Sequence, residues 1–377
     1  MRWGISVPSQ PPFAVAQMIA GVADSVGFES LWLWDHLLGL WHTEAHEQIA
    51  LAELLPEGDA FFDPYVLATA LGQHWNGAIG TGVTCTTRRH PVVTAQCALS
   101  AQHFLPSGEF ILGVGSGEAE GTVPYGYEYG RPVGRFEEAV QIIRHFFDST
   151  EPLDFKGEHF VIDGGRMALR PPEGKPRPQI WGAAHGPRML DICGRYCDGW
   201  LPAFPQPPEA YAARAERIRA AAREAGRPDP IMAAMFFPVS GESREKVVRD
   251  ANADPLFKSV GLMISDEWLQ RYAGTSHPEP GSRGIVDTVP HRYSLDAVRA
   301  FGESVRADRW VEGGWPMGNA EELTAFYRAY ADAGCEYIVI FDSTAALYGV
   351  SALEGAVGTA AQVVAAVPMA PSRAATP

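Results

Sequence analysis

Three side chains lie in loops where they could exchange protons with a bound molecule. Asp35 and His36 directly follow the apolar run LWLW, and Glu118 lies in the glycine-rich stretch GVGSGEAEGTVPYG. Histidine gains and loses a proton near neutral pH, and a neighbouring carboxylate can set its tautomer and its pKa. These residue types indicate acid–base chemistry, although each of them alone is also compatible with an ordinary packed or solvated side chain.

The glycine-rich stretch is not the dinucleotide-binding fingerprint G-x-G-x-x-G. Counted from Gly113, the third glycine is replaced by Glu118, and counted from Gly115 it is replaced by Glu120. Glycines at a strand end still allow backbone amides to approach a ligand, whereas a tight turn without a ligand would use the same residues. The carboxylate of Glu118 inside this loop favours a ligand site over a simple turn.

Two further loops are rich in small residues, GTGVTCTTRRHP (80–91) and WGAAHGPRM (181–189). Small residues would let the backbone approach a flat ring or a phosphate. Arg88 and Arg89 could attract an anion or simply be solvated on the surface. We find no G-x-S-x-G nucleophile elbow, no P-loop and no set of residues at metal-ligand spacing. The pattern therefore favours a planar organic cofactor over hydrolysis or metal chemistry.

Short apolar runs alternate along the chain with longer amphipathic segments, as expected for strands and helices that follow one another. The expected strands are 2–7, 30–34, 78–83, 109–114, 179–183, 198–204, 231–239 and 337–341. The expected helices are 13–26, 64–75, 91–104, 133–147, 187–196, 208–226, 320–334 and 351–366. This alternation with largely apolar strands predicts an α/β fold, a (β/α)8 barrel whose catalytic face is formed by the loops after the strands.

The sequence predicts a single barrel domain over residues 1–367, followed by a disordered tail at 368–377. Insertions are expected at about 151–178, where an alternating segment is typical of a β-ribbon, and at 254–318, which is rich in Pro, Gly and Trp. We expect both insertions to cover the barrel mouth. Three tryptophans of the second insertion would serve either as pocket wall or as packing anchors: Trp268, Trp310 and Trp315.

Charge and composition exclude some function classes. The formal net charge of −15 argues against a nucleic-acid partner, because binding to phosphates needs a basic surface. The five cysteines are too scattered for a disulfide framework. The N-terminus lacks the basic region and long apolar core of a signal peptide, and Glu354 and Gln362 interrupt the apolar stretch near the C-terminus. We therefore expect a cytoplasmic protein with no membrane span and a small-molecule substrate.

Several motifs together resemble those of a known family. They are WDHL (34–37), GTGVT (80–84), GVGSGEAEGTVPYG (113–126) and WGAAHGPRML (181–190), followed by GRYCDGW (194–200). In order and spacing they resemble the luciferase-like flavin and deazaflavin oxidoreductases over nearly the whole chain. The similarity is strongest to the actinobacterial branch that uses the deazaflavin coenzyme F420, which includes phthiodiolone ketoreductases, glucose-6-phosphate dehydrogenase and alcohol dehydrogenases. The resemblance implies a luciferase-type (β/α)8 barrel, often dimeric, that transfers a hydride between the deazaflavin C5 and a carbonyl or alcohol carbon.

The resemblance also implies a role for each matching residue. His36 corresponds to the acid/base that exchanges a proton with the substrate oxygen, and Glu118 to the carboxylate near the ring. Asp35 would contact the deazaflavin, and Gly82 and Val83 match a non-proline cis peptide that bulges against the back of the ring. Further contacts to the ring or its side chain would come from Thr84, Ser116 and Gly117, and contacts to the phosphate region from Ala183, Ala184, His185 and Gly186. No metal ligand is implied.

Some features differ from the relatives that oxidise sugars or alcohols. Leu40 stands where those relatives carry a tryptophan four residues after the histidine, and Trp41 follows it. His185 stands where the sugar dehydrogenases have glycine, and no set of lysines suits a sugar phosphate. Two other functions are compatible with the sequence: an FMN-dependent monooxygenase that uses O2 and a partner flavin reductase, and a non-catalytic barrel that binds a deazaflavin.

Overall fold

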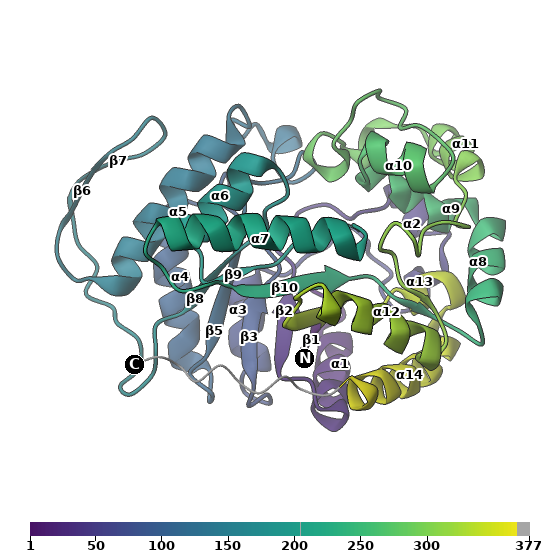
Figure 1. The fold of residues 1–377 in the computed structure, drawn as a ribbon, viewed down its shortest axis with the longest axis horizontal. Helices are drawn as coiled ribbons and strands as arrows, with labels where there is room; N and C mark the ends of the chain where they lie inside the picture. Colours follow the sequence, from purple (N-terminus) through teal and green to yellow (C-terminus); the bar gives the residue numbers. More distant parts are fainter. Residues whose placement is uncertain (204, 368–377) are drawn as a thin grey trace.

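The computed structural model describes residues 1–203 and 205–367, and its centre is a closed barrel of eight parallel strands (Figure 1). Neighbouring strands follow the order β1-β2-β3-β5-β8-β9-β10-β13, and β13 pairs with β1 to close the ring. The strands are β1 (Arg2–Val7), β2 (Ser30–Leu33), β3 (Ala78–Thr81), β5 (Phe110–Gly115), β8 (Gln179–Gly182), β9 (Gly199–Trp200), β10 (Ile231–Phe236) and β13 (Tyr337–Ile340). The predicted (β/α)8 barrel is confirmed.

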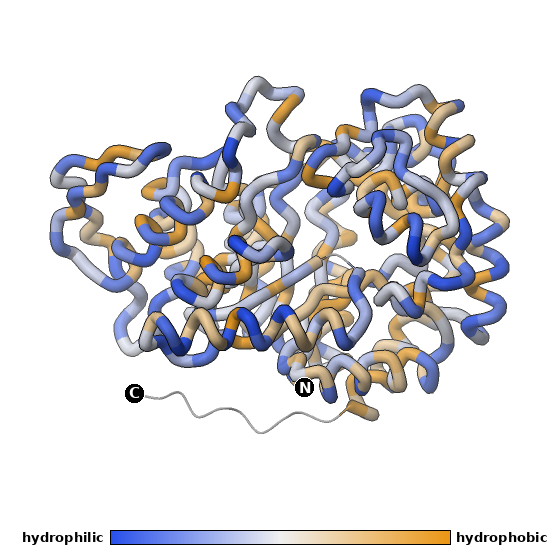
Figure 2. Tube along the Cα trace, turned by 45° about the horizontal axis from the view of Figure 1, so that its top comes forward, coloured by the Kyte–Doolittle hydropathy of each residue, from blue (hydrophilic) through white to orange (hydrophobic). Residues whose placement is uncertain are grey.

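One long helix follows each barrel strand and covers its outer side (Figure 1). These helices are α1 (Phe13–Val26), α3 (Pro64–Leu71), α4 (Pro91–Phe104), α5 (Pro132–Asp148), α6 (Pro187–Tyr196), α7 (Pro208–Glu224), α12 (Ala320–Asp332) and α14 (Leu353–Ala366). They alternate hydrophilic and hydrophobic residues along their length, as Figure 2 shows. Their apolar sides pack on the barrel, which is why a 3.6-residue period was visible in the sequence.

Proline and glycine set several of the helix ends. The bounds of α1, α4 and α6 agree with the predicted helices, because proline stands at the first helical position of α4 and α6 and Gly27 ends α1 with a φ of 90°. The expected strand at 198–204 is shorter in the structure, and the expected strand at 231–239 ends early as β10. After β10 comes a separate short strand, β11 (Val239–Ser240), which pairs with β12 (Met317–Gly318).

The segment 254–318 lies at the barrel mouth and is more helical than its composition indicated. Its elements are α9 (Pro255–Lys258), η3 (Ser259–Met263), α10 (Asp266–Tyr272), η4 (Gly284–Val286), η5 (Pro290–Arg292) and α11 (Leu295–Ser304). It follows α8 (Arg244–Ala253), another helix that the sequence analysis did not predict. The whole group occupies one end of the molecule (Figure 1).

The first insertion is the predicted β-ribbon, formed by the antiparallel strands β6 (Leu153–Lys156) and β7 (Val161–Gly165), but it does not cover the mouth. The ribbon connects α5 to β8, and such helix-to-strand connections lie at the amino ends of the strands. The Glu138 carboxylate of α5 accepts hydrogen bonds from the backbone N–H groups of residues 158–160. The expectation that this segment covers the mouth is therefore wrong, and Figure 1 shows the ribbon far from α9–α11.

Three apolar clusters stabilise the described chain, and the smallest, which includes Trp32, Trp181 and Tyr337, is formed mainly by residues of the barrel strands. The other two differ in place. The larger one surrounds the barrel between strands and helices and includes the apolar residues of the ribbon. The smaller one lies mainly within the mouth segment and contains Trp268, Trp310 and Trp315 together with Val239 and Val247. The tryptophans of the second insertion are thus packing anchors, and Trp315 also contacts the cavity described below.

The remaining expectations about the chain concern cysteines, membrane segments and the tail. All five cysteines are free thiols. Within the described residues, no helix has both the length and the apolar character that a membrane crossing requires. The expected disordered tail at 368–377 lies outside the described residues.

Candidate active site

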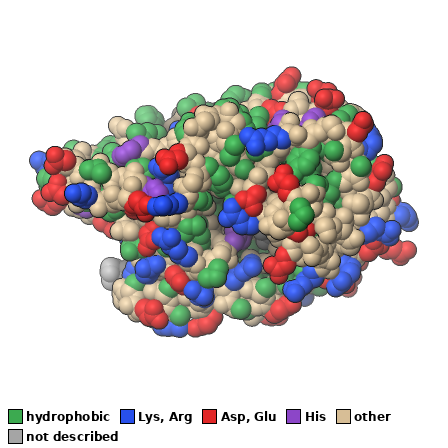
Figure 3. Space-filling view, turned by 90° about the horizontal axis from the view of Figure 1, so that it is seen from above, with side chains coloured by type: hydrophobic (Ala, Val, Ile, Leu, Met, Phe, Trp, Pro, Cys, Tyr) green, Lys and Arg blue, Asp and Glu red, His purple; other side chains and the backbone are tan. Residues whose placement is uncertain are grey.

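The loops after the strands enclose a cavity at the carboxyl end of the barrel. Seen from above, the surface is hollowed, with hydrophobic, histidine and basic side chains around the hollow (Figure 3). Residues directly after β2, β3, β5, β8, β9, β10 and β13 line the cavity, among them His36, Val83, Ser116, Glu118, Ala183, His185, Leu201, Phe237 and Phe341. The parallel barrel therefore brings together the loops that the sequence analysis selected separately.

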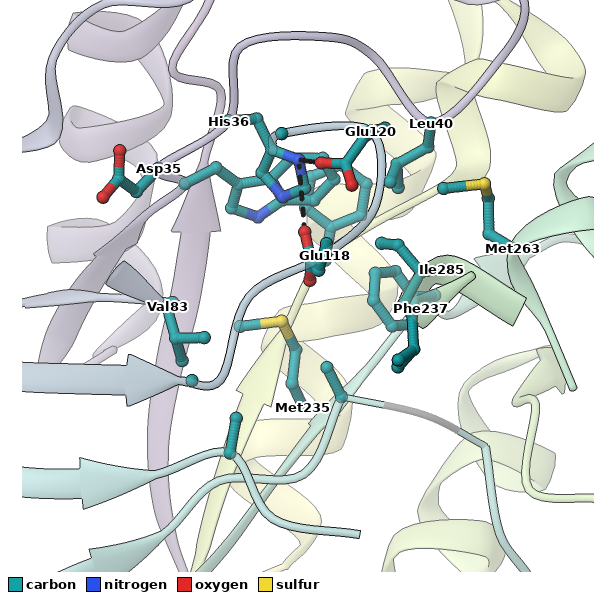
Figure 4. Close-up of a pocket in the computed structure, with 18 of the residues that line it drawn as sticks. Asp35, His36, Leu40, Val83, Glu118, Glu120, Met235, Phe237, Met263 and Ile285 are labelled. Carbon is teal, nitrogen blue, oxygen red and sulfur yellow. Dashed lines mark hydrogen bonds and ion pairs between the residues drawn. The ribbon is translucent and has the colours of Figure 1, made fainter. Parts of the chain in front are cut away.

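His36 lies beside two carboxylates that come from the loop after β5 (Figure 4). Its Nδ1 atom is 3.0 Å from Oε1 of Glu120 and 3.7 Å from Oε2 of Glu118. The side chains of His36 and Glu120 are 9% and 1% exposed, whereas that of Glu118 is 32% exposed. The first distance is that of a hydrogen bond and the second is longer, so Glu120 is the direct partner of the imidazole.

These three groups change one another's affinity for protons. Burial acts to lower the pKa of His36, but the negative charges of Glu118 and Glu120 outweigh it and raise this pKa above its usual value. Burial, together with the negative charge of Glu120, raises the pKa of Glu118 to about 8. At neutral pH Glu118 therefore holds a proton.

Asp35 follows β2 immediately before His36, but its carboxylate points away from the cavity (Figure 4). Its Oδ1 atom lies 2.9 Å from Nη2 of Arg88 and 3.5 Å from Nη2 of Arg89. The side chains of Asp35 and Arg88 are only 3% and 8% exposed. Arg88 is thus neither a free anion site nor a solvated surface residue, because it forms a buried ion pair. The predicted contact between Asp35 and a cofactor stays a prediction.

The other predicted cofactor residues fall into two groups. Gly82, Val83, Ser116, Gly117, Ala183 and His185 line the cavity, and the peptide bond between Gly82 and Val83 is cis, as the resemblance implied. Thr84, Ala184 and Gly186 lie outside the cavity lining. The hydroxyl of Thr84 bonds to that of Tyr65 behind the wall, at 3.0 Å. The contacts of these residues with a cofactor stay predictions.

His185 and His36 both line the cavity, but their pKa values are shifted in opposite directions. Burial, with the charge of Arg214, lowers the pKa of His185 to about 3. The imidazole is therefore neutral at physiological pH and cannot serve as a cation for an anionic group. It follows β8 and stands just before α6, next to the backbone N–H groups at the amino end of that helix.

The wall opposite these polar groups is apolar and comes largely from the mouth segment. Its side chains include Leu40, Trp41, Met235, Phe237, Phe257, Val260, Met263, Ile264, Ile285 and Trp315. Most of these were not selected from the sequence, because the mouth segment contains no chemical motif and only the folded chain places it over the barrel. Leu40 and Trp41, whose role the resemblance left open, both line the cavity.

Glu120 is the site residue that the sequence analysis missed. It was noted only as a position where a glycine is absent, yet its spacing of two from Glu118 was visible. His36, Glu118 and Glu120 each offer one ligand atom within 4.8 Å of the others, a spacing that a cation could use. A proton held by Glu118 competes with such binding, and the absence of a metal from the reaction stays a prediction.

Comparisons with known proteins agree with this geometry. The family model described as luciferase-like monooxygenase matches residues 1–337. A phthiodiolone/phenolphthiodiolone dimycocerosates ketoreductase from Mycobacterium bovis is 34% identical over 345 residues, 89% of each chain. An F420-dependent glucose-6-phosphate dehydrogenase from Nakamurella multipartita is 26% identical and covers 85% of this chain and 84% of its own. The structure of an F420-dependent secondary alcohol dehydrogenase with an F420-acetone adduct has a TM-score of 0.72, at 21% identity, covering 97% of this chain and 99% of its own.

Proposed function

Because the chain belongs to the luciferase-like monooxygenase family, we propose that it is an oxidoreductase that uses coenzyme F420. The reaction would move a hydride between the deazaflavin C5 and the carbon of a ketone or secondary alcohol. The names of the mycobacterial ketoreductase and of the F420-dependent dehydrogenase support this cofactor and this reaction class. The observation that carries the proposal is His36, held beside Glu118 and Glu120 in an apolar cavity.

The residues at the mouth fit a long planar cofactor with a phosphate. Val83, Gly117 and Ala183 line one side of the cavity with small or flat surfaces. At Gly186 a β-carbon would meet no other heavy atom within 4 Å, so this backbone is open. Gly186 also precedes α6, whose ten residues begin without a side-chain cap. Backbone N–H groups at such a helix start bind phosphate, which suits the predicted role of Ala183, Ala184, His185 and Gly186.

The residues of the chain handle the proton. When bound, the deazaflavin supplies or accepts the hydride. His36 would donate a proton to the substrate oxygen during ketone reduction and take it back during alcohol oxidation. Glu118, which holds a proton at neutral pH, would supply or store one on the cofactor side. The side chain of His36 is only 9% exposed, so it acts where electrostatic interactions are stronger than in water, whereas Glu118 stays one third exposed.

The apolar wall also indicates the substrate. Arg88 is the one Lys or Arg side chain among the described lining residues, and Asp35 already pairs with it. A sugar phosphate would therefore find no free cation there. The wall suits a ketone or alcohol with a hydrocarbon chain, and the reaction class agrees with the name of the mycobacterial ketoreductase.

The first experiment is a tryptophan-fluorescence titration of the purified protein with F420 and, separately, with FMN. Quenching by F420 at micromolar or lower concentration, with little effect of FMN, is the expected result. Preferential binding of FMN would contradict the proposal and favour an oxygen-dependent monooxygenase. Binding of F420 without turnover of any ketone or alcohol would favour a non-catalytic barrel.

A further inference from the structure

We propose that Glu120 is the positioning residue of this site, because it holds the imidazole of His36 by Nδ1 and so reserves Nε2 for the substrate oxygen. The substrate part of this inference rests on the proposed function, whereas the pairing itself does not. Nothing in the family resemblance assigned a role to Glu120.

Glu120 and Glu118 differ in their distance from Nδ1 of His36 and in their exposure, which indicates different roles. Glu120 is nearly inaccessible and lies at hydrogen-bond distance from Nδ1, whereas Glu118 is farther from that atom and one third exposed. A buried carboxylate is unfavourable unless it is paired. Among the described residues, Oε2 of Glu120 has no hydrogen-bond partner, and Oε1 pairs this carboxylate with the basic side chain of His36. Glu118 is the carboxyl group that remains accessible from the cavity.

The backbone on both sides of Glu120 is fixed by hydrogen bonds. The N–H of Ala119 donates to the carbonyl of Ile285 in the mouth segment, at 3.0 Å. The hydroxyl of Thr122 donates to the carbonyl of Glu118, at 2.6 Å. Glu120 is thus held in place by the protein itself, before any cofactor binds. This rigidity is what a positioning residue needs.

The charges around His36 support the same division. The groups that face its ring are Glu118, Glu120 and Arg88, with the aromatic rings of Trp34 and Phe61 on its faces. Arg88 forms a buried ion pair with Asp35. Because two close carboxyl groups do not both ionise readily, the negative charge stays on one of them and the proton on the other. Glu118, whose pKa is raised, holds that proton, and the carboxylate at the shorter distance from Nδ1 is that of Glu120.

An anion at Nδ1 has a direct chemical consequence. It keeps a proton on Nδ1 in the neutral ring, so that Nε2 is the nitrogen that gains and loses a proton. A carboxylate that holds an imidazole in this way sets its orientation and tautomer, and stabilises the charged ring when it forms. Glu120 therefore acts through His36 and does not touch the substrate.

The test compares Glu120→Gln with Glu118→Gln by NMR of 15N-histidine-labelled protein without cofactor. The His36 signal is assigned by its absence from His36→Gln. In the wild-type protein at high pH, we expect the neutral ring to be protonated on Nδ1. In Glu120→Gln we expect a lower pKa of His36 and a kcat reduced about tenfold or more, with the KM for the cofactor unchanged. Glu128→Gln, the same substitution at an exposed position of the following loop, serves as the control and should change nothing.

Three results would overturn the proposal. One is a wild-type neutral ring protonated on Nε2. Another is a His36 pKa that falls in Glu118→Gln but not in Glu120→Gln, which would make Glu118 the partner. The third is an unchanged kcat in a folded Glu120→Gln protein. The tautomer measurement needs no variant, so it decides the matter even if Glu120→Gln does not fold. It also needs neither cofactor nor turnover, so failure of the proposed function would not be mistaken for failure of this inference.

Discussion

At the scale of residues, the site depends on one histidine with raised affinity for its proton. Replacing it by His36→Ala removes the group that would protonate the substrate oxygen. We expect kcat to fall by about 10²–10⁴-fold, the usual contribution of a positioned acid or base. Affinity for F420, measured by fluorescence titration, should change little, because His36 is not a predicted cofactor contact. An unchanged kcat in this variant would show that His36 is not the acid/base for the substrate oxygen.

The pKa of Glu118 predicts the pH dependence of the reaction. Burial and the charge of Glu120 raise this pKa to about 8, so the carboxyl group is protonated below that pH and loses its proton above it. During ketone reduction Glu118 would take up the proton that the reduced cofactor gives up along with its hydride, so it must be unprotonated, and kcat should rise as pH rises through about 8. Alcohol oxidation should show the opposite slope. In Glu118→Gln, kcat measured as a function of pH should no longer change near pH 8. If the change near pH 8 persists, it must come from the titration of another group.

The sequence predicted part of this site and not the rest. His36 and Glu118 could be found because acid–base residues directly after apolar strands meet at one face of a parallel barrel. The pairing of Arg88 with Asp35 could not be found, since two residues 53 positions apart meet only after the loops fold. Glu120 was visible in the sequence, but the order of residues does not indicate which of the two carboxylates contacts Nδ1 of His36.

At the scale of elements, the ribbon and the mouth segment should behave differently when changed. Glu138 of α5 accepts three backbone hydrogen bonds from the turn of the ribbon, on the outer side of the barrel. Glu138→Ala should lower the free energy of unfolding by about 1–3 kcal/mol, the cost of leaving such groups unpaired, and leave kcat unchanged. Thermal unfolding measures the change in stability, and a steady-state assay measures kcat. A loss of kcat in the folded variant would place the ribbon closer to the chemistry than the structure does.

The mouth segment should determine which substrates bind. If a hydrocarbon chain lies against its apolar wall, each added methylene of a 2-ketone contributes up to ~0.8 kcal/mol. The KM should then fall by up to about fourfold per methylene until the wall is covered. Glucose 6-phosphate is the negative control. A KM independent of chain length would show that the wall does not hold the substrate.

The elements also show where sequence patterns suffice. Helices α1, α4 and α6 were predicted to the residue because proline or glycine marks their ends and their apolar faces repeat. The short helices of the mouth segment, such as α10 and η5, were not predicted. Their residues fold around the apolar cluster of the mouth segment, whose members are brought together from distant parts of the chain. Helix α8 was missed although Ser243 caps it by accepting from the N–H of Lys246.

At the scale of the whole molecule, the family resemblance predicts a homodimer, and the surface offers candidate contacts. Val66 of α3 and Val93 and Phe104 of α4 are 67%, 45% and 61% exposed, and these two helices pack side by side. Light scattering should give twice the chain mass of 40.9 kDa. Phe104→Glu should shift the protein toward the single-chain mass if these helices form the interface. A single-chain mass for the wild-type protein would contradict the prediction.

The separate apolar cluster of the mouth segment has a consequence for how such proteins diversify. The barrel packs around one cluster, while the segment over its mouth packs mainly around another. Wall residues of the mouth segment can therefore vary at little cost to the barrel, while the bond from the Ala119 N–H to the Ile285 carbonyl ties the loop of Glu118 and Glu120 to this segment. Evolution or an engineer can thus replace what the enzyme accepts while keeping how it reacts.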